Sequence, residues 1–239
     1  MSLFMRKITA IIVAAALWPA LASAEEATDP RADIAAMIPG LVPEDVRKAP
    51  MDGLYEVAMG SQIVYVSDDR KYLFKGDIID LSTNESITEK RRGGLRLAEV
   101  NQLGDDDMVI FGPADAKHTI TVFTDVDCTY CRKLHKEMAQ LNASSIRVRY
   151  VFFPRFGPGS ESWAKAEAVW CSEDRQSAMT AAKNGEEVVA ASCTTPVAEH
   201  YSLGNKVGVR GTPALMMEDG ELFPGYVPAA DLAEFLEQS

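Results

Sequence analysis

Residues 124–131, TDVDCTYC, contain two cysteines separated by two residues. Just before Cys128, residues 119–124 alternate apolar side chains with threonines, which is typical of a β-strand. Beyond it, apolar positions recur with helical spacing at Cys131, Leu134, Met138 and Leu141. The sequence therefore predicts a strand that leads through Cys128 into the first turn of a helix.

The pair Cys128 and Cys131 lies where a helix favours thiolate chemistry. Unpaired backbone N–H groups and the positive end of the helix dipole stabilise a thiolate at a helix start. The thiolate is the attacking species in thiol–disulfide exchange, and a stabilised thiolate also leaves readily. We expect Cys128 to attack a substrate and Cys131, on the apolar face one turn further, to resolve the mixed disulfide. Charged side chains of both signs lie close by in the sequence: Arg132, Lys133, Lys136, Asp125 and Asp127.

Other uses of a Cys-x-x-Cys motif fit this sequence poorly. A c-type haem site has histidine directly after the second cysteine, where this chain has Arg132. A zinc ribbon needs a second close pair, but Cys171 and Cys193 are far apart. A purely structural disulfide in so tight a loop is strained. The motif predicts a redox-active pair, with neither a metal nor a cofactor.

Length, composition and charge narrow the class of protein. The 239 residues have room for one large domain or two modest ones. With 47% hydrophobic and 25% charged residues, a disordered or collagenous chain is excluded. The formal net charge of −11 argues against a nucleic-acid binder held by a basic surface.

Residues 1–24 describe a secretory signal peptide. A short basic start precedes an apolar run, and an Ala-x-Ala site predicts cleavage after Ala24. The alternative is a membrane anchor, but the apolar run at residues 8–21 is short for a membrane span. We expect export, and the bacterial periplasm is the favoured destination.

The second cysteine pair has a different character. In an oxidising compartment a separated pair is most simply a structural bridge, and closing a loop of this size stabilises the fold by roughly 3 kcal/mol. Of the three pairings that four cysteines allow, this favours Cys128 with Cys131 and Cys171 with Cys193. A second redox centre is the alternative.

Thr212-Pro213 precedes a predicted strand, and a proline after a tight turn is where a cis bond can be fixed. A cis-proline facing the Cys-x-x-Cys pair would block metal capture. It would also expose the Thr212 backbone to an extended substrate. From the residues alone, a trans proline is the commoner case.

The rest of the chain predicts two unequal domains. Residues 25–85 form a small α+β unit, with a short helix near Ile34 and strands at residues 54–59, 63–66, 72–74 and 78–81. So small a unit buries little core, and a second copy of itself is its simplest partner. Residues 86–106 predict a connecting helix weakened at Gly93-Gly94, with a flexible linker as the alternative.

Residues 107–239 predict an α/β domain with βαβ organisation. After the motif come a strand at residues 146–153 and a mostly helical stretch at residues 160–191 that holds Cys171. A hairpin at residues 214–223 follows. A last helix opens at Pro228, with the inward-facing residues Leu232, Phe235 and Leu236.

These features together resemble a known family. The segments that carry the resemblance are VFTDVDCTYCRKLHKEM (residues 122–138), YVSDDRKYLFKGDIIDLS (residues 65–82), the helical insert with its cysteine pair, and the leader. They are similar to the DsbC/DsbG family of periplasmic disulfide isomerases, over nearly all of the chain after the leader. The resemblance implies a dimerisation domain (25–85), a linker helix (86–106) and a thioredoxin-like domain (107–239) with a helical insert at about residues 158–204.

The resemblance also implies roles and partners. It makes Cys128 the nucleophile, Cys131 its partner, Thr212-Pro213 a cis-proline loop and Cys171–Cys193 a structural disulfide. It implies a V-shaped homodimer whose active sites face a shared cleft and are kept reduced by a membrane reductase of the DsbD type. Two departures stand out. The motif has Thr129-Tyr130 where the isomerases commonly have Gly-Tyr, and Gly93-Gly94 interrupts the linker, which predicts more mobile arms.

The expected function is rearrangement of wrong disulfides in misfolded exported proteins, with chaperone activity as a possible addition. Tyr130 contacts substrate or merely covers the disulfide, and His135 is expected to be packed or solvated rather than catalytic. Two alternatives remain. One is a thiol oxidase or dedicated reductase on the same fold, and the other is a holdase chaperone whose cleft binds unfolded chains without chemistry.

Overall fold

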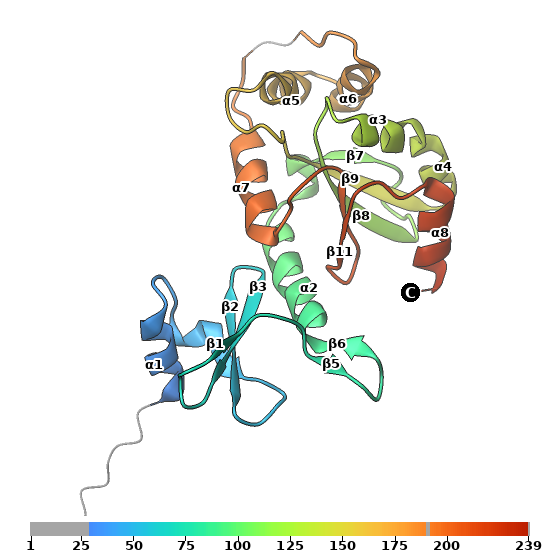
Figure 1. The fold of residues 1–239 in the computed structure, drawn as a ribbon. Helices are drawn as coiled ribbons and strands as arrows, with labels where there is room; N and C mark the ends of the chain where they lie inside the picture. Colours follow the sequence, from blue (N-terminus) through green and yellow to red (C-terminus); the bar gives the residue numbers. More distant parts are fainter. Residues whose placement is uncertain (1–28, 190–191, 239) are drawn as a thin grey trace, which may run out of the picture.

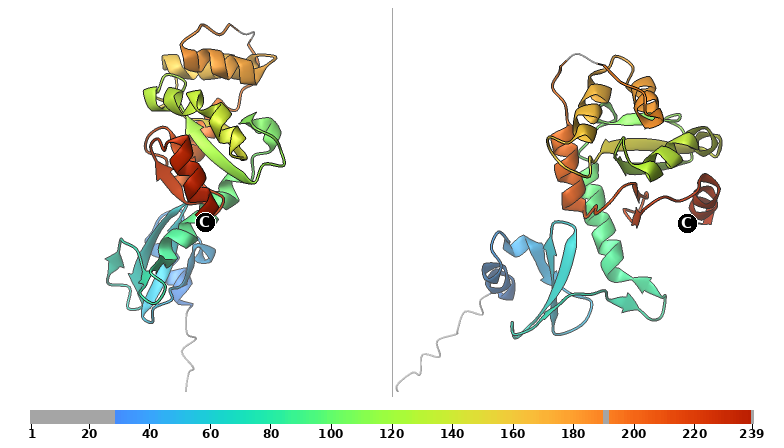
Figure 2. Two further views of the ribbon diagram at one scale, coloured as in Figure 1. Left: turned by 90° about the vertical axis from the view of Figure 1, so that its right-hand side faces the viewer. Right: turned by 45° about the horizontal axis from the view of Figure 1, so that its top comes forward.

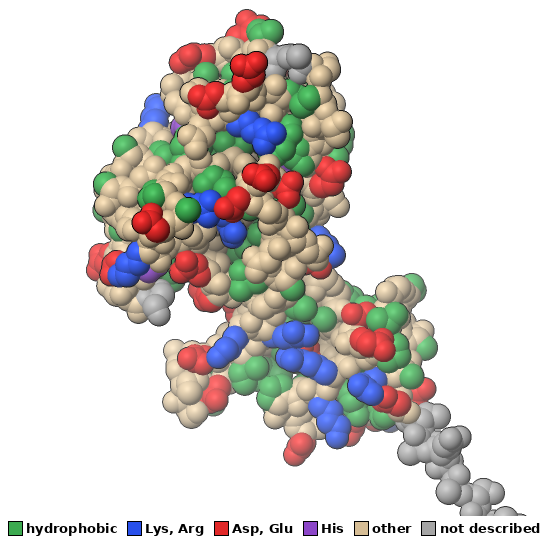
Figure 3. Space-filling view, turned by 180° about the vertical axis from the view of Figure 1, so that it is seen from behind, with side chains coloured by type: hydrophobic (Ala, Val, Ile, Leu, Met, Phe, Trp, Pro, Cys, Tyr) green, Lys and Arg blue, Asp and Glu red, His purple; other side chains and the backbone are tan. Residues whose placement is uncertain are grey.

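The computed structural model describes residues 29–189 and 192–238, which form two domains joined by a helix (Figure 1). The predicted signal peptide lies outside the described residues. Among the residues described, no helix is both long and apolar enough to cross a bilayer. Seen from behind, the domains meet at a narrow waist, and acidic and basic side chains are spread over both of them (Figure 3).

The smaller, N-terminal domain is an antiparallel sheet packed against a short helix. Helix α1 (Pro30–Met37) starts at Asp29, whose carboxylate accepts a hydrogen bond from the backbone of Arg31. Its buried Ile34 packs against valines of the sheet. The sheet has the strand order β1 (Val46–Lys48), β2 (Leu54–Met59), β3 (Gln62–Ser67) and β4 (Leu73–Phe74), with the 3₁₀ turn η1 (Pro43–Asp45) before it.

A two-stranded sheet of β5 (Ile79–Asp80) and β6 (Glu85–Ser86) completes this domain. The four strands predicted from the sequence are all present, as β2 to β5. The sequence pattern did not reveal β1 and β6. Strand β1 is three residues long and only its Val46 is buried, so it carries no alternation to detect.

The linker is one unbroken helix, α2 (Ile87–Val100), which begins where Ser86 accepts a hydrogen bond from the Glu89 backbone. The predicted connecting helix is therefore present, and it continues through Gly93-Gly94 without a break, while the greater mobility of the arms stays a prediction. The helix is also shorter than predicted, and residues 105–107 form a separate 3₁₀ turn, η2 (Asp105–Asp107).

Gly93 is needed for close packing between the linker and the larger domain. It is buried, and a Cβ there would lie 2.5 Å from the carbonyl oxygen of Asp219. Gly220 faces it with a positive φ of 83°, which a glycine adopts freely. Arg96 strengthens this contact, because its guanidinium donates to the carbonyl oxygens of Gly220 and Val207, each at 3.2 Å.

The larger domain is built on a five-stranded sheet. Its strand order is β11 (Leu222–Pro224), β10 (Ala214–Met216), β8 (His118–Thr124), β9 (Ile146–Phe152) and β7 (Val109–Phe111). Strands β8 and β9 are parallel, and the other neighbours are antiparallel. Strand β7 was not predicted. The remaining elements follow the predicted βαβ organisation.

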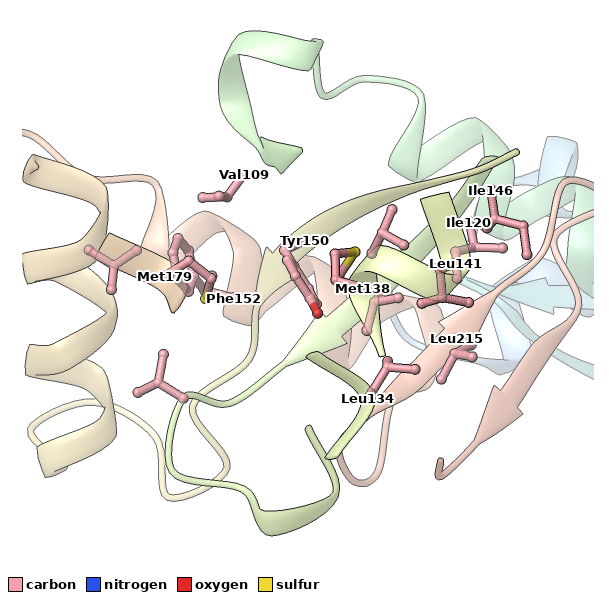
Figure 4. Packing of buried hydrophobic residues seen from close by; sticks show 14 of the residues in the cluster. Val109, Ile120, Leu134, Met138, Leu141, Ile146, Tyr150, Phe152, Met179 and Leu215 are labelled. Atoms are coloured by element: carbon pink, nitrogen blue, oxygen red, sulfur yellow. The ribbon is translucent and has the colours of Figure 1, made fainter. Parts of the chain in front are cut away.

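Alternation along β8 and β9 divides the core between the two faces of the sheet. Val122 and Tyr150 belong to the cluster that also contains residues of α3 (Thr129–Lys136), α4 (Met138–Ala143) and α8 (Ala229–Gln238) (Figure 4). Phe123 and Val151 point to the other cluster, under α7 (Val197–Val207) and the end of α2. Both faces of the sheet are covered, which explains why apolar residues on opposite faces of these strands, such as Val122 and Phe123, are all buried.

The stretch at residues 160–191 that is predicted to be mostly helical contains two helices. Helices α5 (Glu161–Cys171) and α6 (Arg175–Asn184) lie side by side at one end of the sheet (Figures 1 and 2). Asp174 caps the start of α6 by accepting a hydrogen bond from the backbone of Ser177, so α6 begins as a helix separate from α5. Helix α6 ends at Gly185, which has a left-handed φ of 84°. The predicted helical stretch at residues 160–191 is thus too long at its C-terminal end.

Two further helix predictions need correction. The helical spacing from Cys131 to Leu141 predicts one helix, but the structure has two, α3 and α4, with a break at Glu137. The Glu137 carboxylate accepts hydrogen bonds from Tyr226 and from the backbone of Ala229. In the last helix Leu232 is buried as predicted, but Phe235 is 38% exposed and packs edge-on against Phe223.

The two linker glycines offer a matched test of this packing. We expect Gly93→Ala to lower the free energy of unfolding by about 1–3 kcal/mol, because its methyl group would collide with backbone. Gly94→Ala has open space around its Cβ and should stabilise the helix by about 0.5–1 kcal/mol. Urea unfolding of both variants measures the difference. Equal effects at the two positions would contradict the close contact.

Candidate active site

The cysteine pair sits where β8 gives way to α3, as the sequence predicts. Cys128 is the N-cap residue of α3, and its carbonyl oxygen accepts the first helical hydrogen bond from Arg132 at 2.9 Å. Cys131 lies in the first turn and is fully buried. Both are free thiols.

The Thr212-Pro213 loop meets this pair from a distant part of the sequence. The Thr212–Pro213 peptide bond is cis, and β10 begins directly after it. The Cys128 thiol donates to the carbonyl oxygen of Thr212 at 3.1 Å. The structure thus brings together Cys128, Cys131, Thr212 and Pro213.

The two cysteines differ sharply in acidity. The pKa of Cys128 is lowered to about 5, chiefly by a hydrogen bond from the Cys131 side chain, against the opposing effect of burial. Hydrogen bonds from the Thr212 side chain and the Cys131 backbone lower it further, and the Arg155 guanidinium makes a smaller contribution. Burial raises the pKa of Cys131, and the hydrogen bond shared with Cys128 raises it further. At neutral pH, Cys128 is therefore a thiolate and Cys131 a thiol.

The cations that act on the pair are not the ones nearest in the sequence. Arg132 forms an ion pair with Asp127 at 2.8 Å, and the Lys133 ammonium lies over the Tyr226 ring. Arg155, in the loop after β9, instead contributes to lowering the pKa of Cys128. Lys183, on α6, acts on Cys131.

The sequence analysis missed both Arg155 and Lys183. Arg155 follows a predicted strand, but its proximity to Cys128 depends on the parallel pairing of β9 with β8. Lys183 shares a buried helical face with Met179 and Ala182. A lysine in line with apolar residues of a helix is the one sequence signal that pointed to it.

The Asp125 carboxylate holds the loop before Cys128 in place through several hydrogen bonds. Its carboxylate is buried and accepts hydrogen bonds from the backbones of Asp127 (2.8 Å) and Arg155 (2.9 Å). The Arg155 side chain pairs with the same carboxylate at 3.3 Å. A buried carboxylate bonded in this way fixes the loop backbone on the N-terminal side of Cys128.

Cys128 is buried, at 2% exposed, but the residues that directly follow it are exposed. Thr129 is exposed, and the Tyr130 ring, 60% exposed, stacks on Tyr226 with 6.3 Å between ring centroids. A substrate chain that reaches Cys128 would meet the exposed Tyr130 ring.

His135 is packed, which is one of the two placements expected from the sequence. It is buried between the Tyr150 hydroxyl and the Thr180 hydroxyl, each 3.1 Å from a ring nitrogen. Burial lowers its pKa to about 4, so it is neutral at physiological pH. Within residues 29–189 and 192–238, no group of three or more His, Cys, Asp and Glu side chains could hold a metal ion.

Cys171 and Cys193 form a disulfide bond with a Cα–Cα distance of 5.7 Å. It joins the end of α5 to the segment that leads into α7. Helix α6 lies inside the loop that this bond closes.

A free Cys-x-x-Cys pair at a helix start, with one thiolate and one thiol, defines a thiol:disulfide interchange protein. Residues 105–239 match the thioredoxin-like domain, and residues 20–89 match the disulfide bond isomerase protein N-terminal domain. The chain therefore belongs to the DsbC family and is a disulfide isomerase of that type. The fold class and the enzyme class predicted from the sequence are confirmed.

Individual relatives agree with this assignment. The thiol:disulfide interchange protein DsbC of Escherichia coli strain K12 is 38% identical over 199 residues, which are 83% of each chain. DsbC of Haemophilus influenzae is 34% identical over 81% of this chain and 83% of its own. The crystal structure of a disulfide interchange protein from Neisseria gonorrhoeae shares 30% identity with a TM-score of 0.51, over 57% of this chain and 97% of that one.

The acidity of Cys128 can be tested by its rate of alkylation as a function of pH. We expect the rate to be half-maximal near pH 5 and to fall at lower pH as the thiolate is protonated. Cys131→Ala removes the main hydrogen-bond donor and should move this midpoint upward. Cys131→Ser keeps a hydroxyl donor and should move it less. A midpoint unchanged in both variants would contradict the role of Cys131.

Proposed function

We propose that Cys128 is the nucleophile and Cys131 the resolving thiol of an isomerase that rearranges wrong disulfides in misfolded exported proteins. The observation that carries this assignment is the low pKa of Cys128 beside the raised pKa of Cys131. A nucleophile must be a thiolate when substrate arrives, whereas a resolving group must wait as a thiol.

In the proposed mechanism, the Cys128 thiolate attacks one sulfur of a substrate disulfide. A Cys128–substrate bond forms, the substrate disulfide breaks, and its second sulfur leaves as a thiolate. That thiolate attacks another disulfide in the substrate. Attack of a substrate thiolate on the mixed disulfide then releases Cys128 as a thiolate, with no net gain or loss of electrons.

Cys131 supplies an exit from complexes that stall. It attacks the Cys128 sulfur, so that a Cys128–Cys131 disulfide forms and the substrate leaves reduced. The enzyme then has to be reduced before it acts again. This is the step we assign to a membrane reductase of the DsbD type.

We assign substrate binding to Thr212-Pro213 together with Thr129 and Tyr130. The Thr212 carbonyl lies 3.1 Å from the reactive sulfur, so a chain extended along this loop would present its own sulfur to Cys128. Tyr130 and Thr129 are exposed beside it. Their exposure fits contact with varied substrates through apolar surface and backbone rather than a shaped pocket.

A homodimer formed through the N-terminal domain is the proposed assembly. Strand β4 is at the edge of its sheet, paired only with β3 among the described strands. Large apolar side chains are exposed on β4 and around β5: Tyr72, Leu73, Phe74, Ile79 and Leu81. An exposed apolar edge strand is a ready site for pairing with another chain, and Leu81 is 92% exposed.

Export to the periplasm follows from the predicted signal peptide, residues 1–24, with cleavage after Ala24. The Cys171–Cys193 disulfide supports it, because such bonds persist in oxidising compartments. We propose a structural role for this bond, since it links the end of α5 to the segment before α7 and leaves the Cys128–Cys131 pair free.

Refolding of a scrambled multi-disulfide substrate tests the proposed chemistry. We expect the parent protein to restore native disulfides and Cys128→Ser to abolish this activity. Cys131→Ser should still isomerise but should accumulate mixed disulfides. Net oxidation of reduced substrate by the parent protein would favour an oxidase, and net reduction without reshuffling a dedicated reductase. Suppression of aggregation as the sole activity would favour a holdase.

The proposed dimer is tested by light scattering. We expect the parent protein to have the mass of a dimer and the double variant Leu73→Asp with Phe74→Asp that of a monomer, because two charges at this edge oppose burial. Isomerase activity should be lower in the monomeric double variant than in the parent protein, while its ability to reduce a simple disulfide persists. Val42→Asp is the matched control, at a residue 51% exposed on the same domain but outside β4 and β5. A monomeric parent protein would contradict the proposal.

A further inference from the structure

Lys183 is a buried cation that the mechanism above does not use. Its side chain is 1% exposed, and lysine is almost never so deeply buried without a partner. The Nζ atom donates to the Thr124 hydroxyl oxygen at 2.6 Å and to the Asp125 carbonyl oxygen at 2.9 Å. These two residues end β8 and begin the loop to Cys128.

Burial lowers the pKa of Lys183, and the negative charge of Cys131, followed by that of Asp125 and Cys128, acts against this and favours the ammonium. The Asp125 carboxylate is already engaged by Arg155. The buried ammonium is therefore placed to respond to negative charge on the cysteine pair. In a poorly polarisable interior such an interaction is much stronger than in water.

Thr124 connects Lys183 to Cys131. A hydrogen bond from the Thr124 side chain favours the thiolate of Cys131. A threonine hydroxyl has one hydrogen, and a lysine ammonium can only donate. Because the Thr124 oxygen accepts from Lys183, its one hydrogen is left to point at Cys131.

We propose that Lys183 is a positioning residue for the resolving step, which orients the Thr124 hydroxyl and stabilises the charge that develops on Cys131 as it attacks the Cys128 mixed disulfide. This rests on the proposed roles of the two cysteines. In that step a Cys131–Cys128 bond forms and the Cys128–substrate bond breaks. The electron pair leaves on the substrate sulfur, and the proton lost by Cys131 ends on that sulfur.

Few other groups near Lys183 titrate in the relevant range. From α3, Arg132 acts against the positive charge of Lys183, and burial lowers the pKa of His135 to about 4, so that it is neutral. From β9, the Tyr150 ring lies 5.6 Å from Nζ, and burial raises the pKa of its hydroxyl well above the usual value. The Asp125 carboxylate, from the loop, pairs with Arg155 at 3.3 Å. Burial lowers the pKa of Lys183 itself and raises that of Cys131, so the pH profile of the resolving step reports on these two groups together.

The two cysteines can be followed separately with an aromatic disulfide that releases a coloured thiolate. Attack by Cys128 releases the first thiolate, and attack by Cys131 on the resulting mixed disulfide releases the second. We expect Lys183→Met to slow the second release by about three- to tenfold and to move its pH midpoint upward. Loss of a nearby positive charge raises the pKa of a thiol by about 1–2 units, which lowers the fraction of Cys131 present as thiolate. A thiolate of higher pKa is also the better nucleophile, and this offsets part of the decrease in rate.

Three further variants separate the effect of Lys183 on the orientation of the Thr124 hydroxyl from the effect of its charge. Thr124→Val should slow the second release as Lys183→Met does, because it removes the connecting hydroxyl. Lys183→Gln keeps an amide donor but no charge, and should give an intermediate rate. Lys136→Met removes a lysine that is exposed on α3, and should leave both phases unchanged.

The outcomes distinguish this inference from the proposed function. A second phase with unchanged rate and pH midpoint in both Lys183→Met and Thr124→Val would overturn the role of Lys183. Equal slowing of both phases would assign it a merely structural role and overturn the proposal as well. Absence of the first phase in Cys128→Ser, together with its presence in Cys131→Ser, tests the underlying assignment independently.

Discussion

Cys128 remains a thiolate at neutral pH while Cys131 remains a thiol, because the two share one hydrogen bond. The rest of the larger domain maintains this difference in pKa between Cys128 and Cys131. The helix start supplies the backbone N–H groups near Cys128, and the sheet and helices exclude water from Cys131. A looser fold that admitted water to Cys131 would bring the two acidities together and remove the difference in role.

Asp125 interacts with both of the cations that lie near the cysteine pair. Its carboxylate receives Arg155 from the loop after β9, and its carbonyl oxygen receives Lys183 from α6. Two segments far away in the sequence therefore fix one short loop. The helical insert, which could be taken for an addition to a complete domain, contributes a side chain to the interior of the site.

Local pattern explains what the sequence could predict. The strand that ends at Thr124, the helix after Cys128 and the strands β2 to β5 each carry their periodicity within a few residues. Features that depend on contacts across the fold were not accessible. Gly93 looked like a weakness in a helix because its packing partner, the Asp219-Gly220 turn, is more than a hundred residues away. Arg155 and Lys183 were missed for the same reason, whereas Arg132, next to the motif, proved to be engaged with Asp127.

The Cys171–Cys193 bond has a consequence for how this enzyme comes into being. Helix α6 and Lys183 lie within the loop that the bond closes, so the element that reaches beneath Cys131 is held in place by a disulfide. Before this bond forms, the loop that contains α6 is open. The chain must therefore be oxidised at one pair of cysteines while the other pair remains free, as it is in this structure. The enzyme thus depends for its own structure on the same chemistry that it performs on others.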